Sequence, residues 1–294
     1  YTYFKHTFTR SYPYPNSLKN PTFNGVFHIF TSPTAATTDS FYIFIYKKPH
    51  HPRKEVIHIM KIICQKINLL KSVNISLKAV PSKTTMPILE CILIDATTNQ
   101  IKFTTNDMEL GIETIVDGTI EEKGIIALDA KIFYEIIRRL PDNTVTIKTD
   151  EKLTATITCE KAKFTIPGKS GEDFAYLPLI EKEESLTISQ FTLKEMIRQT
   201  IFSIASNETN KLMTGELFEI KNNYLKIVSL DGHRIAIRRM ELKKDYADRK
   251  VVVPGKTLNE ISKILSGEID DIVNIYFSKI IFYLSLTRLL LFPD

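Results

Sequence analysis

The stretch LECILIDATTNQIKFTTND (residues 89–107) returns as MTGELFEIKNNYLKIVSLD (residues 213–231), with a constant offset of 124 residues and no gap. Each copy has an apolar strand, a polar turn that contains Asn, and an alternating strand that ends on Asp. Further on, GIIALDAKIFYEIIRRL (residues 124–140) matches KVVVPGKTLNEISKIL (residues 250–265), with Glu135 opposite Glu260. The chain therefore contains two similar modules in which strand and helix follow in the same order.

The alternating strands and short polar turns around these helices predict an α+β fold, in which each module is an antiparallel sheet with one face covered by two helices. Stacked or tiled repeats usually act through the shape of their assembly. We therefore do not expect a single catalytic pocket in this chain.

Four amphipathic helices are expected, each with basic residues outside. In residues 65–80 the apolar stripe is Ile67, Leu70, Val73, Leu77 and Val80. A second helix covers residues 131–140, with Asp129 as its N-cap. The last two helices are expected to begin with the capping boxes Thr192–Glu195 and Thr257–Glu260. The outward cations are Lys71, Lys78, Arg138, Lys194, Arg198 and Lys263.

The net charge of +5 comes from the first 59 residues, because residues 60–294 carry 32 Lys and Arg and 32 Asp and Glu. Nucleic-acid binding by this neutral body requires that its cations gather on one face.

Three cysteines without CxxC spacing predict neither a disulfide framework nor a zinc site, and favour a reducing cytoplasm. No apolar run approaches the ~20 residues of a membrane span, which favours a soluble protein.

Residues 1–59 hold five of the six His and six of the thirteen Pro, without periodicity. We interpret them as a disordered or non-native leader, with an aromatic, basic interaction arm as the alternative. Met60 is the expected natural start. Residues 167–184, rich in Gly, Pro and acids, predict a linker, so the expected domains are 60–178 and 186–294, joined by 179–185.

Common phosphate-loop, dinucleotide, metalloprotease and acyl-transfer motifs are absent from the sequence. A metal-dependent nuclease remains an alternative because of four acidic residues, although solvated loops explain them better. These are Asp107, Glu109, Asp270 and Asp271.

Asp231-Gly232 is a hairpin signal, so the residues alone give His233 a structural role in a turn. Basic residues on any one helix are usually only solvated, but four such helices in a repeat could form one phosphate-binding surface.

The segments MKIICQK, KTTMPIL, GEDFAYLP, TGELFE, SLDGHRIAI and VVVPGK occur in this order between residues 60 and 256. Together they resemble the bacterial sliding clamp, the beta subunit of DNA polymerase III. The resemblance implies a DNA-clamp fold and a non-catalytic processivity factor in the form of a ring of protomers around double-stranded DNA, with no cofactor or metal.

The resemblance also implies roles for particular residues. Lys83, Asn207 and Lys211 correspond to DNA contacts. The expected pocket for peptides of polymerase, clamp loader and repair proteins is formed by Met213, Leu230, Gly232, His233, Arg234 and Ile235.

The family has a third domain beyond residue 294, which puts ring closure by a homo-oligomer in doubt and leaves a monomeric peptide-docking fragment as the alternative. The segment KIIFYLSLTRLLLFPD (residues 279–294) fits the expected final hairpin poorly.

Overall fold

The computed structural model describes residues 24–30, 59–177, 185–206, 211–277 and 281–287. For residues 24–30, 211, 281–283 and 287 it describes the backbone only. Asn207, most of the predicted leader and residues 178–184 of the predicted linker lie outside the described residues. Within the described part, no helix is long and apolar enough to cross a bilayer.

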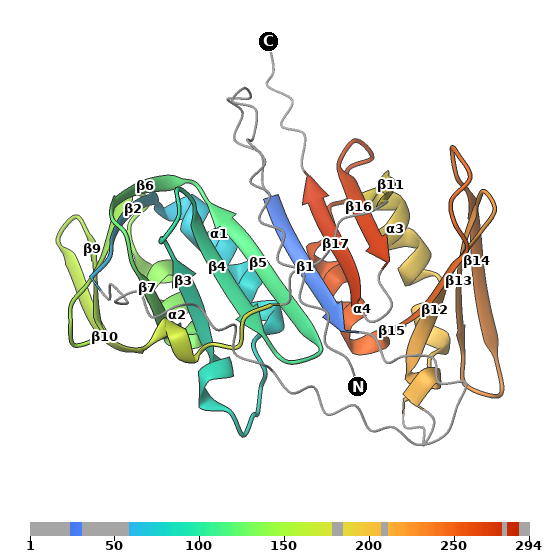
Figure 1. The fold of residues 1–294 in the computed structure, drawn as a ribbon, viewed down its shortest axis with the longest axis horizontal. Coiled ribbons are helices and arrows are strands. Elements are labelled where there is room, and N and C mark those ends of the chain that lie inside the picture. Colours follow the sequence, from blue (N-terminus) through green and yellow to red (C-terminus); the bar gives the residue numbers. More distant parts are fainter. Residues whose placement is uncertain (1–23, 31–58, 178–184, 207–210, 278–280, 288–294) are drawn as a thin grey trace, which may run out of the picture.

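Seventeen strands and four α-helices make up the regular structure of the described residues (Figure 1). The first module contains β2 (Lys61–Gln65), α1 (Lys66–Ser76), β3 (Cys91–Asp95), β4 (Ile101–Asn106), β5 (Leu110–Val116), β6 (Gly118–Glu122), β7 (Ile125–Asp129), α2 (Ala130–Arg139), β8 (Thr144–Thr149), β9 (Thr154–Cys159) and β10 (Ala162–Lys169). The second contains β11 (Ser185–Ser189), α3 (Gln190–Arg198), β12 (Gly215–Lys221), β13 (Tyr224–Leu230), β14 (Ile235–Glu241), β15 (Arg249–Pro254), α4 (Gly255–Ile264), β16 (Ile272–Phe277) and β17 (Ile281–Thr287). The predicted α+β class is confirmed.

Two sheets hold all the described strands. One has thirteen strands, including β1 (Asn24–Phe30), in the order β11-β16-β17-β1-β5-β4-β3-β7-β10-β9-β8-β2-β6, and therefore runs through both modules. The other has four strands in the order β14-β13-β12-β15. Every pairing is antiparallel, as expected for strands joined by short turns.

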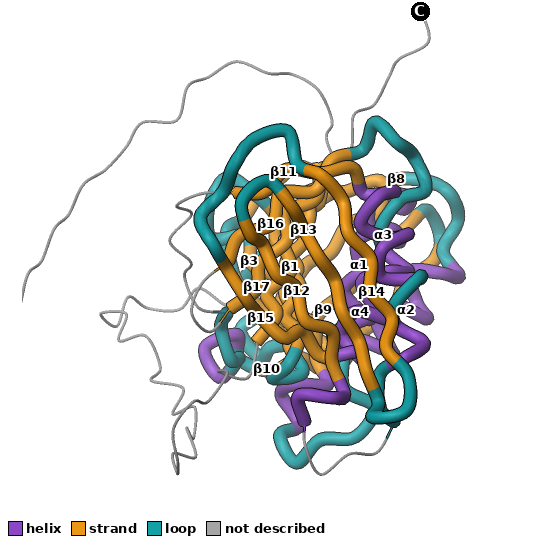
Figure 2. The backbone as a smooth tube through the Cα atoms, turned by 90° about the vertical axis from the view of Figure 1, so that its right-hand side faces the viewer, coloured by secondary structure: helices purple, strands orange, loops and turns teal. Residues whose placement is uncertain are grey.

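The four helices gather along one side of the molecule, and most of the strands lie on the other (Figure 2). Between these layers the first module buries a core that includes Leu69, Phe103 and Phe133. The second module buries Leu193, Phe218 and Leu258 in an equivalent place. One apolar helix stripe packed on one apolar sheet face is what the sequence pattern requires.

The internal repeat is confirmed, and it extends beyond the sequence match. With the same offset of 124 residues, β2 and α1 align with β11 and α3, and β3 and β4 align with β12 and β13. A matched hydrogen bond ties helix to sheet in each module. The Thr105 hydroxyl donates to the Ser76 carbonyl at 2.7 Å, and the Ser229 hydroxyl donates to the Thr200 carbonyl at 2.5 Å.

Helix α2 begins as predicted, because the Asp129 carboxylate accepts from the Ile132 N–H at 2.8 Å. The two predicted capping boxes are wrong. Helices α3 and α4 follow directly on β11 and β15, so that Ser189 and Pro254 are their N-caps, without a side-chain cap. Thr192 and Thr257 consequently lie inside the first turn.

The predicted stripe of α1 is also wrong at Ile67, whose side chain is 74% exposed, while Leu69 and Val73 are buried. Helix α1 follows directly on β2, and its buried residues are Leu69, Ser72, Val73 and Ser76, which leaves Ile67 on the outer side.

Three further expectations need correction. Residues 167–169 belong to β10, and Phe174 is buried against the first module, so only part of the predicted linker can be a free connection. The final segment does form a hairpin, in which β16 pairs with β17 from Ile272↔Thr287 to Phe277↔Phe282. The leader contains a strand, β1 (Asn24–Phe30), so the expectation of disorder fails for these seven residues.

Candidate functional site

The helix side of the molecule carries most of the predicted DNA-contact cations. Lys71, Lys83, Arg138, Arg198 and Lys263 are exposed, and Lys78 is half-buried. Lys211 begins a 3-10 helix that ends at Thr214. The four helices lie on one side of the molecule, which we call the helix surface (Figure 2).

Acidic side chains one turn earlier in three helices reduce the positive charge of this surface. Glu135 lies 2.7 Å from Arg138, Glu195 lies 2.6 Å from Arg198, and Glu260 lies 2.6 Å from Lys263. Hydrogen bonds from Arg138 and Arg198 hold the pKa of Glu135 and of Glu195 below its usual range. Such exposed pairs stabilise a fold only weakly, so their main effect here is on the local potential.

Lys194 has a structural contact that the sequence pattern did not predict. Its ammonium donates to the carbonyl oxygen of Leu265 at 2.9 Å, at the C-terminal end of α4. A cation is favoured there because the last carbonyls of a helix carry partial negative charge. Lys194 therefore joins α3 to α4, and the prediction that it points freely outward is wrong.

The DGHR turn between β13 and β14 has a fixed backbone. The Asp231 carboxylate accepts from the N–H groups of His233 and Arg234, both at 3.1 Å, and these bonds, with the Arg234 side chain, hold the pKa of Asp231 below its usual range. Gly232 has φ of +86°, a left-handed conformation that glycine adopts without a Cβ clash. The hairpin predicted from Asp231-Gly232 is thus confirmed.

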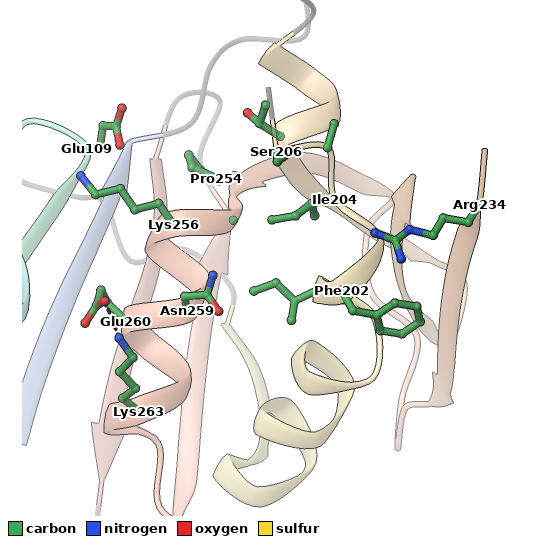
Figure 3. Close-up of a pocket in the computed structure, with 14 residues that line it drawn as sticks. Glu109, Phe202, Ile204, Ser206, Arg234, Pro254, Lys256, Asn259, Glu260 and Lys263 are labelled. Atoms are coloured by element: carbon green, nitrogen blue, oxygen red, sulfur yellow. Dashed lines mark hydrogen bonds and ion pairs between the residues drawn. The ribbon is translucent and has the colours of Figure 1, made fainter. Parts of the chain in front are cut away.

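Arg234 is held between two partners beside a groove. Its Nε lies 2.8 Å from Asp231 Oδ2, and its guanidinium lies 5.9 Å from the ring centre of Phe202. The groove has a volume of about 840 Å³ and is lined by Ile201, Phe202, Ile204, Arg234 and Pro254, together with the α4 residues Gly255, Lys256, Asn259, Glu260 and Lys263 (Figure 3).

Of the predicted pocket residues, only Arg234 lines this groove. Ile235 is 61% exposed and pairs with Leu230 across β13 and β14, and Met213 is half-buried in the 3-10 helix before β12. Phe202, with 59% of its surface exposed, was missed. In the sequence it stands beside the apolar Ile201 of a helical stripe, and only the tertiary structure turns its ring toward Arg234.

A buried carboxylate behind this region was also missed. Glu216 is fully buried, and its Oε1 accepts from the Thr200 hydroxyl at 2.7 Å, whereas Oε2 has no hydrogen-bond partner. Burial raises the pKa of Glu216 to about 7. A proton on this side chain removes the cost of an ionised group in an apolar site.

The residues proposed for the metal alternative are not brought together. The Asp107 carboxylate accepts from the N–H groups of Glu109 and Leu110 and lies 3.4 Å from Lys256. Among the described residues no group of three or more His, Cys, Asp or Glu is arranged to hold a metal ion. Asp107 therefore acts as a turn residue in this structure, as Asp231 does.

Two family models match consecutive parts of the chain. The model for the DNA polymerase III beta subunit, N-terminal domain, matches residues 60–178, and the model for its central domain matches residues 187–291. This chain belongs to the DNA polymerase III beta subunit family. The resemblance found in the sequence is therefore confirmed.

Individual relatives agree with the family. The beta sliding clamp of Bacillus subtilis (strain 168) is 37% identical over 225 residues, which cover 73% of this chain and 60% of the relative. A putative DNA polymerase III beta subunit from Eubacterium rectale is 62% identical, with a TM-score of 0.75, over 80% of this chain and 67% of that structure. The B. subtilis clamp structure is 34% identical, with a TM-score of 0.72, over 80% and 66%. The chain spans about 60% of the length of its curated relatives.

Proposed function

We propose that this chain is part of a DNA sliding clamp, a non-catalytic processivity factor that tethers the replicative polymerase to double-stranded DNA in the cytoplasm. Residues 60–178 and 186–294 would be two of its clamp domains, joined by 179–185. The observation that carries the proposal is that the four helices lie on one side of the molecule (Figure 2) and that each of them carries an exposed cation, which is Lys71, Arg138, Arg198 or Lys263.

The charge of that surface suits a clamp that moves along DNA. Contacts between cations and phosphates carry no sequence information, and their number sets the salt dependence of binding. Because Glu135, Glu195 and Glu260 each pair with a helix cation, the surface attracts DNA without a dense positive field. The DNA contacts we propose are Lys71, Lys78, Lys83, Arg138, Arg198, Asn207, Lys211 and Lys263.

We also propose the DGHR turn as the docking site for short peptides of the polymerase, the clamp loader and repair proteins. Arg234 would present a fixed guanidinium, and Met213, Leu230 and Ile235 would supply apolar contacts. The hydrogen bonds of Asp231 hold this turn without help from a ligand, which keeps the entropy cost of binding low.

Retention on DNA tests the proposal. The chain would be loaded on nicked circular plasmid and passed through a sizing column before and after the plasmid is linearised. Retention that is lost on linearisation supports encirclement, and the native mass gives the number of protomers. Peptide binding without any retention would favour a monomeric docking fragment, and magnesium-dependent cleavage that is lost in Asp107→Asn would favour a nuclease.

A further inference from the structure

The two modules end differently. In the first, β8 and β9 are followed by β10, which pairs antiparallel with β9 over six residue pairs and also with β7. In the second, β16 and β17 are the counterparts of β8 and β9, and no described residue follows Thr287. Within the described residues the second module thus lacks a chain segment in the position of β10.

Strand β1 occupies that position. It pairs antiparallel with β17 from Asn24↔Thr287 to Phe30↔Ile281, as β10 pairs with β9. On its other side it pairs antiparallel with β5, from Gly25↔Thr114 to Ile29↔Leu110. In Figure 1 this blue strand lies between the green β5 and the red β17, and it makes one sheet of the two modules.

We infer that the gap between β5 and β17 is a strand-binding site and that residues 24–30 fill it as a donated strand that completes the second module. Two sheet edges that face each other each present unpaired N–H and C=O groups, and an inserted antiparallel strand satisfies both. The segment NGVFHIF is rich in residues that favour strands, although it stands in a leader without periodicity.

This arrangement fixes how the modules meet. With β1 between them, β5 and β17 run parallel to each other and are separated by two strand spacings, roughly 9.5 Å. Without β1 the facing edges of β5 and β17 would stand two strand spacings apart, and neither would have a hydrogen-bonding partner there. The leader strand therefore joins the two modules into one sheet, and it would do so whether or not the chain acts as a clamp.

Cysteine pairs in the full chain test the site. Val26 faces Ser285 on one side and Glu113 on the other. On mild oxidation, Val26→Cys should form an intrachain disulfide with Ser285→Cys and with Glu113→Cys. The control is Val26→Cys with Asn274→Cys, because Asn274 lies one strand further, opposite Ser285, and a disulfide does not span roughly 9.5 Å.

The native cysteines give little background in this experiment. Cys64, Cys91 and Cys159 are buried, and burial raises the pKa of all three thiols, for Cys64 to about 12. We expect at least ten times more disulfide in the two register pairs than in the control. No difference from the control would overturn the proposal, and disulfide-linked dimers would overturn donation within one chain.

A proline variant gives an independent readout. Phe27→Pro removes a backbone N–H in the middle of β1, and Ile45→Pro is the matched control in the same leader outside the strand. Hydrogen exchange of the β5 and β17 amides should become at least tenfold faster in Phe27→Pro only. Unchanged protection in Phe27→Pro, or an equal loss in Ile45→Pro, would contradict the assignment.

Discussion

The first and second modules share a backbone but differ in the side chains that face the same places. The turn Asp107–Leu110 repeats as Asp231–Arg234, and in both turns the aspartate accepts two N–H bonds. Met108 has φ of 76° where Gly232 has φ of 86°. Yet Leu110 is buried and Arg234 is exposed. The repeat preserves the turn, and the substitutions decide which copy can present a guanidinium to a partner.

A second difference lies inside the cores. Ile92 of β3 is fully buried, and the offset of 124 residues places Glu216 at the same position of β12. One module therefore has a wholly apolar site where the other holds a carboxyl group hydrogen-bonded to Thr200. Because Thr200 starts the segment that carries Phe202, this polar contact lies behind the groove.

The largest effect is expected from giving the first module the residue of the second. Ile92→Glu would bury a carboxylate among aliphatic side chains and should lower the free energy of unfolding at pH 8 by about 4 kcal/mol. Ile92→Val is the control, with an expected loss of about 1 kcal/mol. Urea unfolding measures both, and equal losses would mean that the site at Ile92 is hydrated.

Glu216→Gln should stabilise the protein in a pH-dependent way. The pKa of Glu216 is about 7 in the folded state and about 4.5 when unfolded, so folding retains a proton between these values, and stability falls as pH rises from 4.5 to 7. The variant should gain roughly 3 kcal/mol at pH 8 and nothing at pH 4.

Glu219→Gln is the control of opposite sign. Hydrogen bonds from Lys226 and Lys250 lower the pKa of Glu219 to about 2, so its stabilisation is present above pH 4.5 and is lost as pH falls toward 2. Urea unfolding measures the free energy of unfolding of each variant at several pH values. If that free energy depends on pH in Glu216→Gln as it does in the wild type, a group other than Glu216 causes the dependence.

Arg234→Ala tests whether Arg234, which stands where the first module has Leu110, gives the second module its peptide affinity. Loss of the guanidinium beside Asp231 and Phe202 should weaken a clamp-binding peptide about tenfold in a fluorescence titration. Arg238→Ala changes an exposed arginine on β14, the strand that follows the turn, and should leave the affinity within twofold. Equal losses in the two variants would indicate a general charge effect.

The smallest effect concerns the turn backbone itself. Gly232→Ala should cost about 1 kcal/mol of stability, because a Cβ there has open space but must adopt a positive φ. Gly232→Asn should cost less, since Asn tolerates this conformation. Thermal unfolding compares the two, and a much larger loss in Gly232→Ala would mean that the turn has packing contacts that its Met108 counterpart lacks.

The sequence alone determined the repeat, the α+β class, the family and the DGHR turn. Each of these depends on residues close together in the chain: alternation for strands, Asp-Gly for the hairpin, and ordered short motifs for the family. The N-cap of α2 at Asp129 belongs to the same group, because a cap bonds to an N–H only three residues away.

Tertiary structure decided what depends on distant partners. Lys194 turned from a surface cation into a contact with Leu265, and Phe202 came to lie beside Arg234. Glu216 is buried in the fold and bonded to Thr200, and β1 lies between two strands, the nearer of which begins eighty residues further along the chain. No periodicity in the chain encodes such contacts, because they form only when the folded layers bring separate segments together.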